Sequence, residues 1–112
     1  MAGNPATKAR RAGNLVYTSG QVGRREDGTI AEGIVEQTKY TLMNLEAALA
    51  SEGMDRSHVV RCTVYMSDLS QRPEMNVPYS EFFGDNIPAR AAMGVDLGGT
   101  ILVEIDAVAY KE

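Results

Sequence analysis

Two segments of this chain, residues 58–66 and 100–110, carry apolar side chains at odd and even positions alike. Successive side chains of a strand point to opposite faces of its sheet, so both segments are predicted to be strands with two apolar faces. The expected faces are Val60, Cys62, Val64 and Met66 against Val59, Thr63 and Tyr65, and Ile101, Val103, Ile105 and Ala107 against Leu102 and Val108. Such a sheet must be covered on both sides.

Helical spacing is clearest over residues 33–52, where apolar positions recur every three or four residues. The stripe consists of Val35, Thr38, Leu42, Leu45 and Leu49. A second helix is predicted over roughly residues 72–83, with Asp68 or Ser70 as its cap. Proline lacks the backbone N–H of a helix interior, so we expect a kink or break near Pro78.

The remaining strands are expected over residues 8–11, 15–19 and 89–95. A Gly13-Asn14 turn joins the first two, and Gly98-Gly99 is expected to close a hairpin between 89–95 and 100–110. The pattern predicts one α+β domain over residues 1–112, with both helices on one face of a mixed sheet. The other face then needs a partner subunit, because it would otherwise be an exposed apolar patch.

Composition narrows the classes of partner. A protein with a net charge of −4 does not attract nucleic acid electrostatically over its whole surface. No apolar stretch has the length of a signal peptide or a membrane span. A lone cysteine, Cys62, allows no intrachain disulfide and fits a reducing compartment. One histidine and one cysteine cannot build the usual zinc sites, and no nucleotide-binding fingerprint is present. We therefore expect a soluble, cytoplasmic protein without a cofactor and without nucleic-acid or membrane partners.

Charged residues in the last two strands suggest a site for a small acid. Arg90 follows Pro88-Ala89 among small residues, and an arginine fork grips a carboxylate through two parallel hydrogen bonds. Glu104 and Asp106 project from one face of their strand, and a carboxylate beside a ligand can hold or activate a water. The first expectation is a site with Arg90 as anchor and Glu104 nearby. Ser19 is interpreted as a hydrogen-bond donor near it, and Cys62 as a core residue.

Several motifs in order resemble one family. They are residues 15–21 (Leu-Val-Tyr-Thr-Ser-Gly-Gln), Gln37-Thr38 with Leu42, Asn44, Leu45 and Leu49, residues 59–69, Pro88-Ala89-Arg90, and residues 103–109. Together they resemble the YjgF/RidA family of reactive enamine/imine deaminases, over nearly the whole chain from about Ala9.

The resemblance implies a chorismate-mutase-like α+β subunit that forms a homotrimer with sites between subunits. It implies hydrolysis of 2-imino or 2-enamino acids, such as 2-iminopropanoate derived from 2-aminoacrylate, to 2-keto acids and ammonia, with neither metal nor nucleophile. Arg90 matches the arginine that binds the substrate carboxylate, and Glu104 the glutamate associated with the attacking water. Ser19 and Gly20 match residues that line the site.

The N-terminal segment differs from the pattern of this family at one position. Many active members have a Pro-Tyr pair before the first strand, whereas this chain has Pro5-Ala6. We expect a roomier, wetter mouth at Ala6, because an aromatic wall and a hydroxyl are missing.

Other functions stay open at this point. One is a pathway-specific deaminase of an aminomuconate- or aminoacrylate-like acid. Another is a non-catalytic trimer that binds small acids or acts as a chaperone. The ribonuclease or translation-inhibitor label attached to the family is disfavoured by the acidic balance and by the lack of a basic, aromatic surface.

Overall fold

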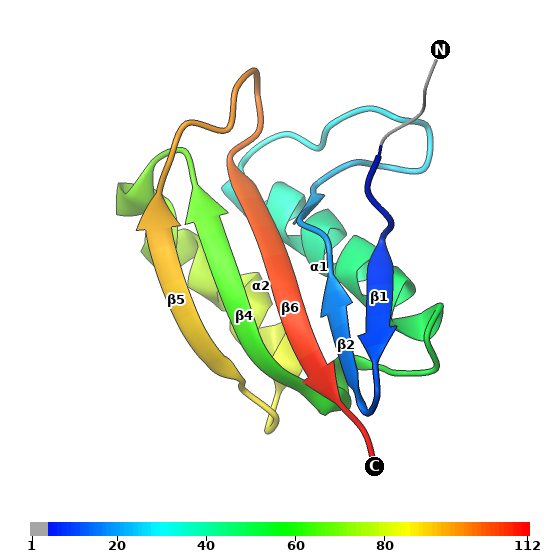
Figure 1. Ribbon diagram of the computed structural model, residues 1–112. Coiled ribbons are helices and arrows are strands. Elements are labelled where there is room, and N and C mark those ends of the chain that lie inside the picture. Colours follow the sequence, from blue (N-terminus) through cyan, green and yellow to red (C-terminus); the bar gives the residue numbers. More distant parts are fainter. Residues whose placement is uncertain (1–4) are drawn as a thin grey trace.

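A computed structural model describes residues 5–112 as a single mixed sheet with two helices on one of its faces (Figure 1). The strands run in the order β1-β2-β6-β4-β5, and the short β3 also pairs with β6. The elements are β1 (Ala9–Ala12), β2 (Leu15–Thr18), β3 (Gln21–Val22), α1 (Ile34–Ala50), β4 (Val59–Met66), α2 (Arg72–Phe83), β5 (Ala89–Gly94) and β6 (Val103–Tyr110). The predicted α+β layer arrangement is confirmed.

The sequence predicted the positions of the first hairpin and of both helices correctly. Gly13 adopts a φ of 61°, which favours glycine, and β1 pairs antiparallel with β2 on either side of it. Leu42, Leu45 and Leu49 of α1 are buried, but Val35 is 37% exposed and Ile34 takes its place in the core. The helix α2 runs through Pro78 without the predicted break, and Pro78 is buried. The predicted cap of this helix is wrong, because α2 has Gln71 at its N-cap and no side-chain cap. Asp68 instead caps the short 3₁₀ turn before α2, Leu69–Gln71, by accepting from the Ser70 N–H.

The predicted hairpin between the last two strands is wrong. β5 pairs in parallel with β4, and β4 separates it from β6. Gly98 and Gly99 do turn the chain, with φ of 72° and 52°, but inside a longer connection that passes over the end of β4. The side-chain amide of Gln37 binds the Thr100 carbonyl and the Leu102 N–H there, each at 2.8 Å. Strand β6 therefore begins at Val103, and Leu102 packs partly against the core.

A register shift in β4 makes the buried and exposed faces of that strand differ from the prediction at its first residues. Between Val59 and Arg61 the pairing with β6 is irregular, so Val59 is buried and Val60 is 49% exposed. Beyond the shift the prediction holds, because Cys62, Val64 and Met66 face the helices and are fully buried.

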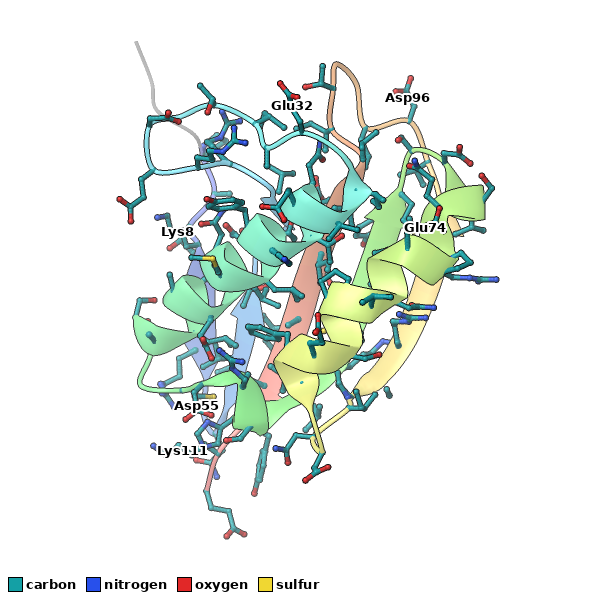
Figure 2. The ribbon with its side chains drawn as sticks, turned by 180° about the vertical axis from the view of Figure 1, so that it is seen from behind. Lys8, Glu32, Asp55, Glu74, Asp96 and Lys111 are labelled. Atoms are coloured by element: carbon teal, nitrogen blue, oxygen red, sulfur yellow. The ribbon has the colours of Figure 1, made fainter. Side chains whose placement is uncertain are left out.

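The core lies between the sheet and the two helices, and the other sheet face is open. In Figure 1 the sheet lies in front of both helices, and Figure 2 shows the helix-covered side. The open face carries Thr63, Tyr65, Glu104, Asp106 and Val108, together with Tyr17 and Tyr110, which are 48% and 43% exposed. Across residues 5–112, neither α1 nor α2 combines the length and apolar composition that a membrane crossing requires.

Candidate active site

Arg90 lies on the edge strand β5 and points toward the helices. It is in register with Cys62, whose buried side chain belongs to the helix-covered face. Its Nη1 donates to Oδ1 of Asn76 at 2.7 Å, and its guanidinium carbon lies 4.9 Å from the centroid of the Tyr79 ring. No carboxylate of residues 5–112 lies within ion-pair distance of it. Arg90 is thus a half-buried, oriented cation whose other N–H donors are available to a ligand.

The helix α2 supplies both residues that hold the guanidinium. Asn76 and Tyr79 are three residues apart, a spacing that places two side chains on the same side of a helix. The Asn76 side-chain carbonyl accepts a hydrogen bond from the guanidinium, and the aromatic ring attracts the cation through its face. Together they restrict the rotation of the Arg90 fork before any ligand arrives.

Glu104 lies on the opposite, open face of the sheet. Its position in β6 is in register with Tyr65 of β4. Burial and, secondarily, the charge of Asp106 raise the pKa of the Glu104 carboxyl. Asp106 itself accepts a hydrogen bond from the Tyr65 hydroxyl at 3.1 Å. A partly desolvated glutamate with a raised pKa is suited to accept a proton from water.

The turn after β2 brings Gly20 against Glu104, and Ser19 precedes Gly20 in this turn. A Cβ at position 20 would stand 2.3 Å from Oε2 of Glu104, so only glycine leaves room for this carboxylate. The Ser19 hydroxyl donates to the Thr7 carbonyl at 2.5 Å, and the Ser19 N–H donates to the Lys8 carbonyl at 2.9 Å. Ser19 therefore ties the N-terminal arm to this turn, and its oxygen keeps acceptor capacity.

One chain does not bring Arg90 and Glu104 together, contrary to the first expectation. They lie on opposite faces of the sheet, and their rows are three residues apart along β4. That spacing corresponds to roughly 10 Å along the strands. The chain therefore presents two separate half-sites: Arg90 with Asn76 and Tyr79, and Glu104 with Ser19 and Gly20.

A cavity of about 550 Å³ adjoins the second half-site. It lies between the N-terminal arm, the turn after β2, the loop that leads to α1, and α1 itself. Its lining includes Ala6, Lys8, Ser19, Gly20, Arg24 and Arg25. The departure at Ala6 thus falls on the cavity wall.

Cys62 is a core residue, as predicted. It is fully buried, and burial raises the pKa of its thiol to about 11. A thiol that stays protonated at neutral pH is a poor nucleophile.

The sequence and the fold match known proteins. The family model described as endoribonuclease L-PSP matches residues 2–111. A RutC family protein of Pyrococcus abyssi is 41% identical over 111 residues, which cover 96% of this chain and 87% of the relative. The 2-iminobutanoate/2-iminopropanoate deaminase of mouse (Mus musculus) is 35% identical over 110 residues, covering 96% of this chain and 82% of the enzyme. The chain belongs to the YjgF/RidA family.

Solved structures of this family share the fold. The YjgF gene product of E. coli superposes with a TM-score of 0.92 at 28% identity, over 99% of this chain and 91% of YjgF. TdcF of E. coli, solved with bound serine, gives a TM-score of 0.91 at 27% identity, over 99% of this chain and 91% of TdcF.

Sequence reasoning missed Asn76 and Tyr79. The available signal was their spacing within the predicted second helix, on the same side as the buried Met75 and Phe83. What the sequence did not provide was the side of β5 on which Arg90 emerges, since that depends on the register with β4.

Proposed function

We propose that this chain is a hydrolase that converts reactive 2-imino and 2-enamino acids, of the 2-iminopropanoate and 2-iminobutanoate type, to 2-keto acids and ammonia. The observation that carries the proposal is Arg90. Its guanidinium is held by Asn76 and Tyr79, lacks an ion-pair partner within residues 5–112, and retains unused N–H donors. Such a group is prepared for a substrate carboxylate. Family relatives named as deaminases of these imines support the choice of substrate.

Glu104 supplies the proton transfers. A water adds to the carbon of the protonated imine and gives one proton to the Glu104 carboxylate, so that a carbinolamine forms. The Glu104 carboxyl then returns this proton to the nitrogen, and the carbon–nitrogen bond breaks as ammonia leaves. The carbinolamine hydroxyl gives its proton to the Glu104 carboxylate as the keto group forms, and Glu104 releases that proton to solvent. Burial and the Asp106 charge raise the pKa of Glu104, which favours the uptake of a proton from water by its carboxylate.

The two half-sites are completed by a second copy of the chain. Because Arg90 and Glu104 occupy opposite faces of one sheet, one substrate can reach both only if they come from different subunits. The open face carries exposed Tyr17 and Tyr110, which another copy would cover. A homotrimer that sets the β5 edge of one subunit against the open face of the next is the arrangement we propose.

The test is hydrolysis of freshly generated imino acids. An amino-acid oxidase produces the imine from alanine or 2-aminobutanoate, and ammonia or the keto acid is followed with and without the protein. If the protein is a deaminase, the imine is lost at a rate that increases in proportion to the protein concentration. A non-catalytic binder of small acids leaves the rate at that of the buffer and contradicts the proposal.

A further inference from the structure

The cavity beside Ser19 is strongly basic although the whole chain is acidic. Its lining contains three cations, Lys8, Arg24 and Arg25, against one carboxylate, Glu26, in a protein of net charge −4. Within residues 5–112, no carboxylate forms an ion pair with any of the three cations. A local excess of positive charge in a concave site attracts an anionic group.

The arginines are held by their own loop. Nη1 of Arg24 donates to the Gly28 carbonyl at 2.9 Å. Nη1 of Arg25 donates to the Thr29 hydroxyl and to the Ile30 carbonyl, each at 3.2 Å, and its guanidinium carbon lies 5.7 Å from the centroid of the Tyr40 ring. These contacts orient the two side chains, and the Asp27 carboxylate of the same loop interacts electrostatically with Arg25 without forming an ion pair within residues 5–112.

The loop itself is fastened to α1. The Asn44 side-chain amide donates to the Val22 and Arg24 carbonyls at 3.0 and 2.9 Å. In the view of Figure 2, Lys8 is drawn below this loop, and it lines the same cavity as Arg24 and Arg25. The two arginines therefore belong to a loop that is fixed on α1.

This cavity adjoins the proposed catalytic half-site at Gly20. Ser19 and Gly20 line the cavity, and Gly20 also contacts the Glu104 carboxylate. Gly20 and Arg24 are four residues apart, so their Cα atoms are separated by at most about 14 Å. Ala6, which has a small side chain, lies on the lining of the same cavity.

We propose that the basic cavity binds a second carboxylate of the substrate, so that this enzyme prefers imino acids with an acidic side chain. This inference rests on the proposed function. A carboxylate on the side chain meets Lys8, Arg24 and Arg25, whereas an apolar side chain leaves three cations without an anionic partner. The glutamate-derived imine, 2-iminoglutarate, has the required chemistry.

The experiment compares acidic and apolar ligands of similar length. Calorimetry measures binding of 2-oxoglutarate and 2-oxobutanoate, the products of the corresponding imines, and kcat/KM is measured for both imines. The test variant is Arg24→Gln/Arg25→Gln. The control, Lys39→Gln/Arg72→Gln, removes two positive charges from exposed helix positions outside the cavity.

The expected result is a preference of roughly tenfold for the acidic ligand, since partly exposed ion pairs each contribute little. The test variant loses this preference and keeps its activity on 2-iminobutanoate, and the control keeps both. Equal binding of the two keto acids, unchanged in the test variant, overturns the inference. If neither imine is hydrolysed, the proposed function fails, and the binding measurements still decide what the cavity recognises.

Discussion

Replacing Arg90 by lysine tests whether the anchor depends on the shape of the guanidinium or only on its charge. In the structure one N–H group binds Asn76 and the cation stacks on Tyr79, which leaves the rest of the fork for a carboxylate. Lysine keeps the positive charge, but its ammonium cannot offer two parallel N–H bonds in a fixed plane. A hydrogen bond to a charged group contributes about 1.5–3 kcal/mol. Losing one of the two therefore lowers kcat/KM roughly 10- to 150-fold.

The assay is steady-state hydrolysis of 2-iminobutanoate by the natural protein and by Arg90→Lys, with thermal unfolding as a check of the fold. The matched control is Arg72→Lys, which makes the same change at an exposed position at the start of α2. We expect the control to behave like the natural protein. Undiminished kcat/KM in Arg90→Lys would show that a point charge suffices and would refute the role of the fork.

Four further predictions concern Glu104, its two neighbours and Cys62. Glu104→Gln is expected to lower kcat strongly while affinity for 2-oxobutanoate changes little, because the amide cannot accept a proton; equal losses in both would make Glu104 structural. The pKa read from the acidic limb of the pH profile of kcat/KM should lie above the ordinary pKa of glutamate. Asp106→Asn should move this limb to lower pH, because the Asp106 charge helps to raise the pKa of Glu104. A limb that does not move contradicts the assignment. Gly20→Ala should reduce activity with little loss of thermal stability, because its Cβ would displace the Glu104 carboxylate; full activity would mean that this contact is unimportant. Cys62 should resist alkylation at pH 8 in the native protein and react after unfolding, since at a pKa of about 11 roughly one thiol in a thousand is ionised.

Elements specified by neighbouring residues could be predicted from the sequence. The stripe of α1 and the Gly13-Asn14 turn of the first hairpin are local patterns, and the structure confirms both. The pairing of β5 could not be obtained from the Gly98-Gly99 signal, because strand partners are chosen by non-local contacts. The order strand–helix–strand of β4, α2 and β5 was the better indication of this pairing, since a helical crossover is the usual way to join parallel strands.

The candidate site shows the same division. The residue types and motifs identified Arg90, Glu104, Ser19 and Gly20 as candidates, but not how they are grouped. The face on which Arg90 emerges follows from its register with Cys62, and the faces of β4 are altered by the irregularity at Val59. Neither feature leaves a signal in the residue pattern. Only the structure shows that Arg90 and Glu104 lie on opposite faces of the sheet, and this separation is the basis for proposing a site shared between subunits.

The most direct test of the account is complementation between two inactive variants. Arg90→Ala and Glu104→Ala are purified alone and after co-expression, and hydrolysis of 2-iminobutanoate is measured for each preparation. If each site takes Arg90 from one subunit and Glu104 from the next, random assembly restores both residues in about a quarter of the sites. The account predicts two inactive single variants and a co-expressed preparation with about that fraction of natural activity. A co-expressed preparation as inactive as the single variants would contradict it.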